Sequence, residues 1–228
     1  MSNQRPQPLA RNEYGAKRDA ALQTARRIDW RFLLPNPRLG RVAYIGPPGG
    51  TLLTALGQFS ASLTCIAPSD QTGPLQRHPS GFELVVLRSR KIAAVEKAHT
   101  LLRAGGYLYW EVERLRGLAP IYRITEQAGW KECCSWRSVE SYLISLERLG
   151  FCNIEVHWHR PSFENCLEMI PLHEESALRY LFTQKRQGFA AQTLLAAGHL
   201  LLKTGWLQRL VPCLSIVACK RLASVAMV

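Results

Sequence analysis

The distribution of apolar residues along the chain predicts alternating strands and helices. Six short stretches have the nearly continuous apolar character of buried strands, at residues 42–45, 62–67, 82–87, 107–112, 151–158 and 214–219. Helical spacing of apolar residues connects them, at residues 12–28, 52–59, 91–102, 138–149, 174–187 and 189–203. Strands that alternate with helices predict an α/β fold with a mostly parallel sheet and helices on both of its faces.

Local signals place several boundaries. Ser138 and Gly150 can cap the two ends of one helix, and Gly105-Gly106 is expected to end the helix before it. After the first helix, residues 29–35 break the helical pattern, and we expect Trp30 and Phe32 to anchor this segment against the domain.

The first strand runs directly into a glycine-rich turn at residues 46–50, and a helix follows. This order opens a nucleotide-binding βαβ unit, in which backbone N–H groups at the helix start face an anionic ligand. Pro47 and Pro48 have no N–H to offer, so the amides of Gly46, Gly49, Gly50 and Thr51 are the expected donors.

Several motifs in order resemble the class I S-adenosylmethionine (SAM) methyltransferases. VAYIGPPGG resembles their glycine loop, FELVVL their fourth strand, and LLRAGGYLYWEV their fifth strand with its preceding turn. LERLGF with IEV, and later LSIVACK, resemble the closing antiparallel strand pair. The matches cover residues 41–112 and 138–220, and they imply a Rossmann-like methyltransferase fold with an antiparallel last strand.

The resemblance implies SAM as cofactor and a set of residues to bind it. The set lies at the glycine turn and after the two following strands: Tyr44, Gly46, Gly49, Gly50, Asp70, Leu87 and Arg88. Tyr44 stands where the family has an acidic residue, and Ala67 or Pro68 where an acid binds the ribose, with Asp70 close behind. The 14 residues from 68 to 81 are too few for a further strand with its helices. We therefore predict six strands, without the family's third-strand unit.

Two side chains are candidates for acid–base chemistry. His159 lies near the end of a strand and titrates near neutrality, and Glu111 lies at the carboxyl end of another strand, where open α/β sheets bind ligands. The alternative for His159 is a surface or hydrogen-bonded histidine. His157 and His159 share a strand face, but no third ligand is evident beside them, so no metal site is predicted.

Charge and termini suggest partners and location. The formal net charge is +12, and residues 1–41 hold nine Lys or Arg and three Asp or Glu. This excess suits an anionic membrane surface or acidic partner, or only a solvated arm. Nucleic acid is not favoured, since aromatic residues do not interleave with this basic arm in the way that single-strand binders use them for stacking. The polar start and seven scattered cysteines predict no signal peptide and a cytoplasmic protein, peripheral to a membrane if the surface contact holds.

The expected organisation is a basic arm and helix at residues 1–40 and a methyltransferase-like domain at 41–228, with a helical insertion at about 160–212. The helix at 189–202 is apolar nearly all round, so we expect it to pack as a lid near Trp110 and Trp158, in preference to a membrane contact. The leading hypothesis is methyl transfer to a small-molecule, natural-product, peptide or lipid acceptor. The alternative is a non-catalytic methyltransferase-like scaffold or partner protein that has lost SAM binding.

Overall fold

The computed structural model describes five stretches of the chain and a few positions near residue 200. The stretches are residues 9–66, 81–89, 91–113, 139–183 and 211–222, and the isolated positions are 196, 198, 200, 201, 203 and 204.

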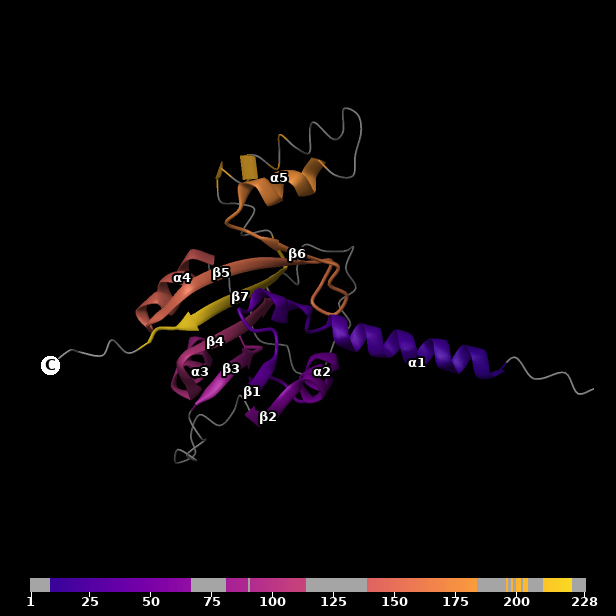
Figure 1. Ribbon diagram of the computed structural model, residues 1–228. Helices are drawn as coiled ribbons and strands as arrows, with labels where there is room; N and C mark the ends of the chain where they lie inside the picture. Colours follow the sequence, from indigo (N-terminus) through magenta and orange to yellow (C-terminus); the bar gives the residue numbers. More distant parts are fainter. Residues whose placement is uncertain are drawn as a thin grey trace, which may run out of the picture.

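The described residues form one seven-stranded sheet (Figure 1). In spatial order the strands are β2, β1, β3, β4, β7, β5 and β6. Their bounds are β1 Leu39–Ile45, β2 Ser60–Ile66, β3 Phe82–Leu87, β4 Leu102–Glu113, β5 Phe151–Arg160, β6 Glu168–Pro171 and β7 Cys213–Lys220.

The strand directions confirm the predicted sheet type. Strands β2, β1, β3 and β4 pair in parallel, while β7 pairs antiparallel with both β4 and β5. Strand β5 therefore runs in the same direction as β1, and the last strand of the chain lies antiparallel between two of these parallel-oriented strands.

The predicted count of six strands is wrong by one. The additional strand is β6, which forms a hairpin with β5 inside the region predicted as a helical insertion. Its four residues contain Glu168 and Pro171 and lack an apolar run, so no periodic signal marked it. The segment where the third-strand unit was expected to be missing, residues 68–81, lies outside the described residues except for Gly81.

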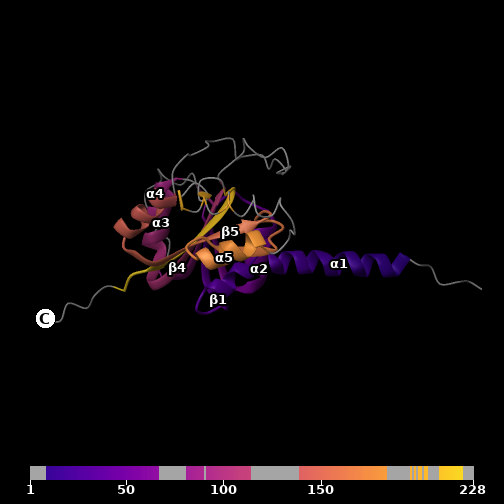
Figure 2. The ribbon, with the colours of Figure 1, turned by 90° about the horizontal axis from the view of Figure 1, so that it is seen from above.

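Helices pack on both faces of the sheet, because side chains of successive strand residues point to opposite faces. Ala43 and Ile45 of β1 belong to one core, which includes α3 Ile92–Leu101 and α4 Val139–Arg148. Val42 and Tyr44 belong to the other, with the 3₁₀-helix η1 Asp29–Leu33 and α2 Thr51–Phe59. Helix α1 Leu9–Arg26 extends away from the sheet in Figures 1 and 2, and α5 Glu175–Thr183 lies beyond β6.

The anchoring segment after α1 is confirmed for one of its two aromatic residues. Trp30 is buried and stacks on Tyr109 of β4, with 3.7 Å between ring centroids. Phe32, which was expected to be buried beside it, is 63% exposed. In the tight 3₁₀ turn, residues two apart do not face the same side, so only one of the pair reaches the core.

Gly105 was expected to end a helix, and it lies inside a strand instead. Helix α3 ends at Leu101 and β4 begins at the next residue. Phe82 of β3 pairs with Leu102, but Leu84 pairs with Tyr107, so β4 carries extra residues at this point. Gly105 has a φ of +71°, which serves this irregularity in the strand.

Most of the predicted lid at residues 189–202 lies outside the described residues, which include only positions 196, 198, 200 and 201 of it. Of its described positions, Leu200 is 64% exposed, whereas Leu201 packs against the core that α3 and α4 cover. Within the described part of the chain, no helix is both long and apolar enough to cross a membrane.

Replacing Gly57 with alanine should stabilise the fold by about 0.4–1 kcal/mol. Gly57 is exposed within α2, and an added Cβ would meet only the Leu63 Cδ2 atom at 4.0 Å. Gly150→Ala is the contrasting control, since its φ of +89° disfavours any side chain and the change should be destabilising. Urea denaturation measures both variants, and a loss of stability in Gly57→Ala would contradict this prediction.

Candidate functional site

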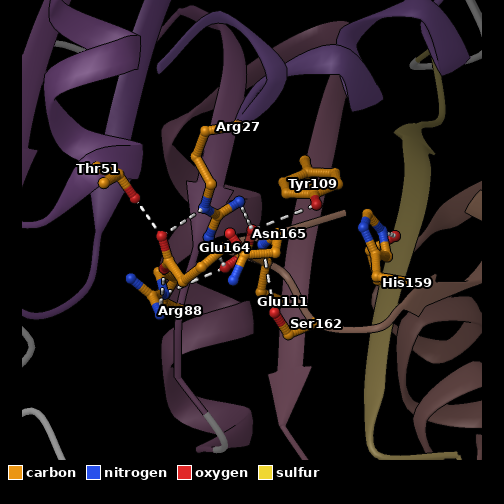
Figure 3. A network of polar contacts seen from close by, with 10 residues as sticks. Arg27, Thr51, Arg88, Tyr109, Glu111, His159, Ser162, Glu164 and Asn165 are labelled. Carbon is orange, nitrogen blue, oxygen red and sulfur yellow. Dashed lines mark hydrogen bonds and ion pairs between the residues drawn. The ribbon is translucent and has the colours of Figure 1, made fainter. Parts of the chain in front are cut away.

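A cluster of ion pairs lies at the carboxyl edge of the parallel strands, beside the glycine turn (Figure 3). Its centre is Glu111, near the end of β4, and its partners come from segments far apart in sequence. Arg27 lies between α1 and η1, and Arg88 directly follows β3. Open α/β sheets bind their ligands at this edge.

Arg27 and Glu111 form a bidentate pair, although they are 84 residues apart. Arg27 Nη1 donates to Glu111 Oε1 over 2.7 Å, and Nη2 donates to Oε2 over 2.8 Å. Each side chain is only 1% exposed. Parallel hydrogen bonds of this kind fix the guanidinium plane as well as its position.

Arg88 and Tyr109 complete the contacts of this carboxylate. Arg88 Nε lies 3.1 Å from Glu111 Oε2, and the Tyr109 hydroxyl donates to Oε1 over 3.3 Å. The backbone holds Arg88 in place, because its N–H donates to the Ile45 carbonyl at the end of β1 over 2.8 Å. Glu111 therefore joins the ends of three parallel strands.

The pairing decides the charge states. Burial alone would raise the pKa of Glu111, but the charge and hydrogen bonds of Arg27, with Arg88, hold that pKa below its usual range. Burial alone would lower the pKa of Arg27, and Glu111 reverses this and raises it. Both groups are charged at neutral pH, and both carboxylate oxygens of Glu111 are already bound by neighbouring side chains.

One end of the glycine turn is exposed to solvent, and the other end is buried. Gly49 and Gly50 have φ values of +81° and +90°, and the residues from Pro48 to Thr51 are exposed. A Cβ on Gly49 would meet nothing within 4 Å, so a ligand can approach the backbone there. Gly49 and Gly50 directly precede the first turn of α2, and the free N–H groups of a helix start attract an anion.

Tyr44 covers the first glycine of the turn. Its hydroxyl donates to the Pro47 carbonyl over 3.0 Å, and a Cβ on Gly46 would lie 2.6 Å from that hydroxyl oxygen. Burial raises the pKa of Tyr44, which the nearby Arg88 charge opposes. The tyrosine is thus a neutral phenol packed on the turn where the resemblance would place an acid.

His159 lies in β5, on the same side of the molecule as this cluster. Its Nε2 lies 2.7 Å from the Ser215 hydroxyl, and its ring centroid lies 6.5 Å from that of Tyr109. Burial lowers the pKa of His159 to about 3, so the ring is neutral at pH 7. A neutral imidazole is the form that a base requires, although its Nε2 already has a partner.

Stability should fall as the pH is lowered from about 6.5 toward 4, because two histidines are buried in neutral form. Burial lowers the pKa of His157 to about 4 and that of His159 to about 3, from 6.5. Below pH 6.5 these histidines become protonated in the unfolded chain but stay neutral in the folded one. The free energy of unfolding therefore falls by about 1.4 kcal/mol per pH unit for each histidine.

Urea midpoints measured between pH 7 and 4.5 test this, and His157→Asn should reduce the slope by about one histidine's share. The stability that the depressed pKa of Glu111 provides is lost only as the pH falls below 4.5, so it does not contribute in this window. Stability that stays constant between pH 6.5 and 4.5 would contradict the assignment of neutral buried histidines.

The structure brings most of the predicted site residues to one edge. Tyr44, Gly46, Leu87, Arg88 and Glu111 lie at the ends of β1, β3 and β4, with the exposed Gly49 and Gly50 in the turn beside them. Asp70 lies outside the described residues. Sequence reasoning missed Arg27, Thr51 as a side-chain partner, and Glu164. Arg27 resembled any other cation at the end of a basic helix, and nothing in the pattern set it apart.

A small cavity lies behind the cluster. It is about 60 Å³ in volume, and its lining includes Arg27, Trp30, His159, Phe163 and Cys166. Sites for cofactor-sized ligands measure about 300–1,000 Å³, so this cavity is too small for a nucleoside cofactor. The residues that fit the implied cofactor are those at the glycine turn: exposed backbone donors, positive-φ glycines and a neighbouring arginine.

Comparison with known proteins gives a likeness in fold. No family model and no curated protein matches the chain. Solved structures of SAM-dependent methyltransferases do resemble it. An Archaeoglobus fulgidus enzyme has 14% identity and a TM-score of 0.47, with 88% of this chain and 94% of that chain covered. A possible histamine N-methyltransferase from Thermotoga maritima has 13% identity and a TM-score of 0.45, with 92% and 95% covered.

The Haemonchus contortus phosphoethanolamine N-methyltransferase 2, solved in complex with S-adenosyl-L-methionine, has 16% identity and a TM-score of 0.44. The match covers 85% of this chain and 51% of that one, so the chain spans about half of that protein's length. These values describe a distant likeness in fold and nothing about activity. The fold class is set by the sheet itself, which is Rossmann-like with the antiparallel last strand of the methyltransferase fold.

Proposed function

We propose that the protein is a SAM-dependent methyltransferase whose acceptor is a small molecule, natural product, peptide or lipid. The observation that carries the proposal is the exposed glycine turn between β1 and α2. Its two positive-φ glycines and the start of α2 lie at the ligand-binding edge of the sheet, beside Arg88.

The chain's own residues would bind and orient the reactants. The amides of Gly49, Gly50 and Thr51 would receive the cofactor, with Gly46 and Tyr44 beneath it and Leu87 and Arg88 at its side. When bound, SAM supplies a methyl group activated by the sulfonium charge. Such a displacement depends mainly on alignment and on exclusion of water, and the edge of the sheet would supply the alignment.

The acid–base roles of His159 and Glu111 stay predictions. Glu111 is paired with two arginines, which supports a positioning role for it: it holds both guanidinium groups beside the turn. His159 is neutral, as a general base must be. To accept a proton at Nε2, it would first have to give up its hydrogen bond with Ser215. Methyl transfer to a neutral or already ionised acceptor needs neither.

The second candidate is a non-catalytic scaffold of the same fold, and Tyr44 favours it. The tyrosine ring closes over Gly46, and Pro48 removes a donor from the turn. A scaffold of this kind would keep the buried cluster for stability and bind no cofactor.

Calorimetric titration with SAM and with S-adenosylhomocysteine (SAH) separates the two candidates. A methyltransferase should bind both ligands saturably, with SAH competing against SAM. Absence of binding at millimolar ligand, in protein shown to be folded by circular dichroism, would leave the scaffold as the function.

A further inference from the structure

The loop between β5 and β6, residues 161–167, places a carboxylate at the glycine turn. Glu164 Oε2 accepts a hydrogen bond from the Thr51 hydroxyl at the start of α2 (Figure 3). The same oxygen lies 3.4 Å from Arg27 Nε, and Oε1 lies 3.9 Å from Arg88 Nη2. One carboxylate thus contacts a helix start and two arginines that come from three separate segments.

These contacts have the composition of a carboxylate-binding site. Arg27 and Arg88 are only 2% and 6% exposed, and Glu111 supplies one negative charge between the two positive ones. Arg27 Nε has no hydrogen-bond partner, and the 3.4 Å separation from Glu164 is an ion-pair contact. A second carboxylate therefore balances the cluster, and buried charges require such balance.

Glu164 differs from the other members in its exposure. Its side chain is 44% exposed, so water competes with the two arginines for its carboxylate. The loop itself is anchored beside it: Phe163 is buried against the His159 ring, and the Leu167 N–H donates to the Arg160 carbonyl over 2.7 Å. Release of Glu164 therefore needs only a local movement.

We propose that Glu164 is an internal occupant of a carboxylate site formed by Arg27, Arg88 and Thr51, and that a carboxylate-bearing ligand takes its place. The ligand is the amino-acid carboxylate of the cofactor, so this inference rests on the proposed function. Because the occupied form cannot accept that carboxylate, Glu164 lowers the apparent affinity by the fraction of molecules in which it is released.

The test compares two ligands on three proteins by calorimetry. SAH carries the carboxylate, and 5′-methylthioadenosine has the nucleoside without it. Glu164→Gln should bind SAH about tenfold more tightly than the unaltered protein, if about one molecule in ten is normally released, and should bind 5′-methylthioadenosine unchanged. Glu155→Gln is the matched control: it removes the same charge from a side chain that is 50% exposed, and it should change neither affinity.

Equal SAH affinities in Glu164→Gln and Glu155→Gln would overturn the proposal. So would a parallel gain for both ligands, since the effect would then not concern the carboxylate. If none of the three proteins binds SAH, the proposed function and the ligand assignment both fail. Amide hydrogen exchange then still tests whether Glu164 contacts Thr51. Exchange at the start of α2, residues 51–54, should be several-fold faster in Glu164→Gln than in Glu155→Gln, and equal rates would show that Glu164 does not hold Thr51.

Discussion

Replacement of Arg27 by methionine should lower the free energy of unfolding by about 3–5 kcal/mol, because it leaves Glu111 buried without its bidentate partner. For a chain of this length, that loss corresponds to a fall of roughly 6–20 °C in Tm. Methionine preserves much of the side-chain volume, so the change reports mainly on the charge. Urea denaturation and thermal melting followed by circular dichroism measure it.

Arg26 provides the matched control. It is the neighbouring residue, it is exposed, and Arg26→Met should change the stability by no more than about 0.5 kcal/mol. Glu111→Gln should cost at least as much as Arg27→Met, since Glu111 contacts two arginines. If Arg27→Met were as stable as Arg26→Met, the buried pair would not support the fold.

Gly49→Val should abolish SAH binding while leaving the circular dichroism spectrum nearly unchanged. At a φ of +81°, a β-branched residue is strained, and its side chain would occupy the open space through which a ligand reaches the turn. We expect a loss of affinity of at least about a hundredfold, of the size that loss of several hydrogen bonds to a charged ligand produces. Calorimetry with SAH measures it.

Gly57→Val controls for the substitution itself. Gly57 lies in the same strand–turn–helix unit, on the exposed side of α2, and its replacement should leave the SAH affinity unaltered. Full SAH binding by Gly49→Val would show that the cofactor does not contact the turn, and the site would have to be sought elsewhere on the sheet.

The sequence predicted the framework well because its signals are local. The apolar runs of the six predicted strands all appear in the sheet, and the glycine turn lies between β1 and α2 as expected. The short strand β6 was not predicted, because its four residues form a strand only through pairing with β5. Gly105 was assigned to a helix end, because a glycine that serves a β-bulge and one that ends a helix share the same positive φ.

The composition of the site was only partly predictable. Tyr44, Gly46, Leu87 and Arg88 were named because the resemblance to the methyltransferases implies them, and the structure places each at or next to a strand end on one edge of the sheet. Trp30 was expected in the core and is buried there, but the position of Arg27 three residues earlier carried no comparable signal. Its partner is 84 residues away, and a contact at that separation leaves no periodic trace in the chain.

The sequence by itself therefore determined the fold class, the glycine turn and the positions of the parallel strands along the chain, all of which follow from periodicity and from short motifs. Only the tertiary structure decided which charges are buried and which are paired. Burial and pairing depend on distances between segments that are remote in sequence, and those distances set the charge states of Glu111 and Arg27 and the neutral form of His159. The place of Glu164 at the glycine turn is a result of the same kind, since it exists only once the β5–β6 hairpin has folded back over the sheet edge.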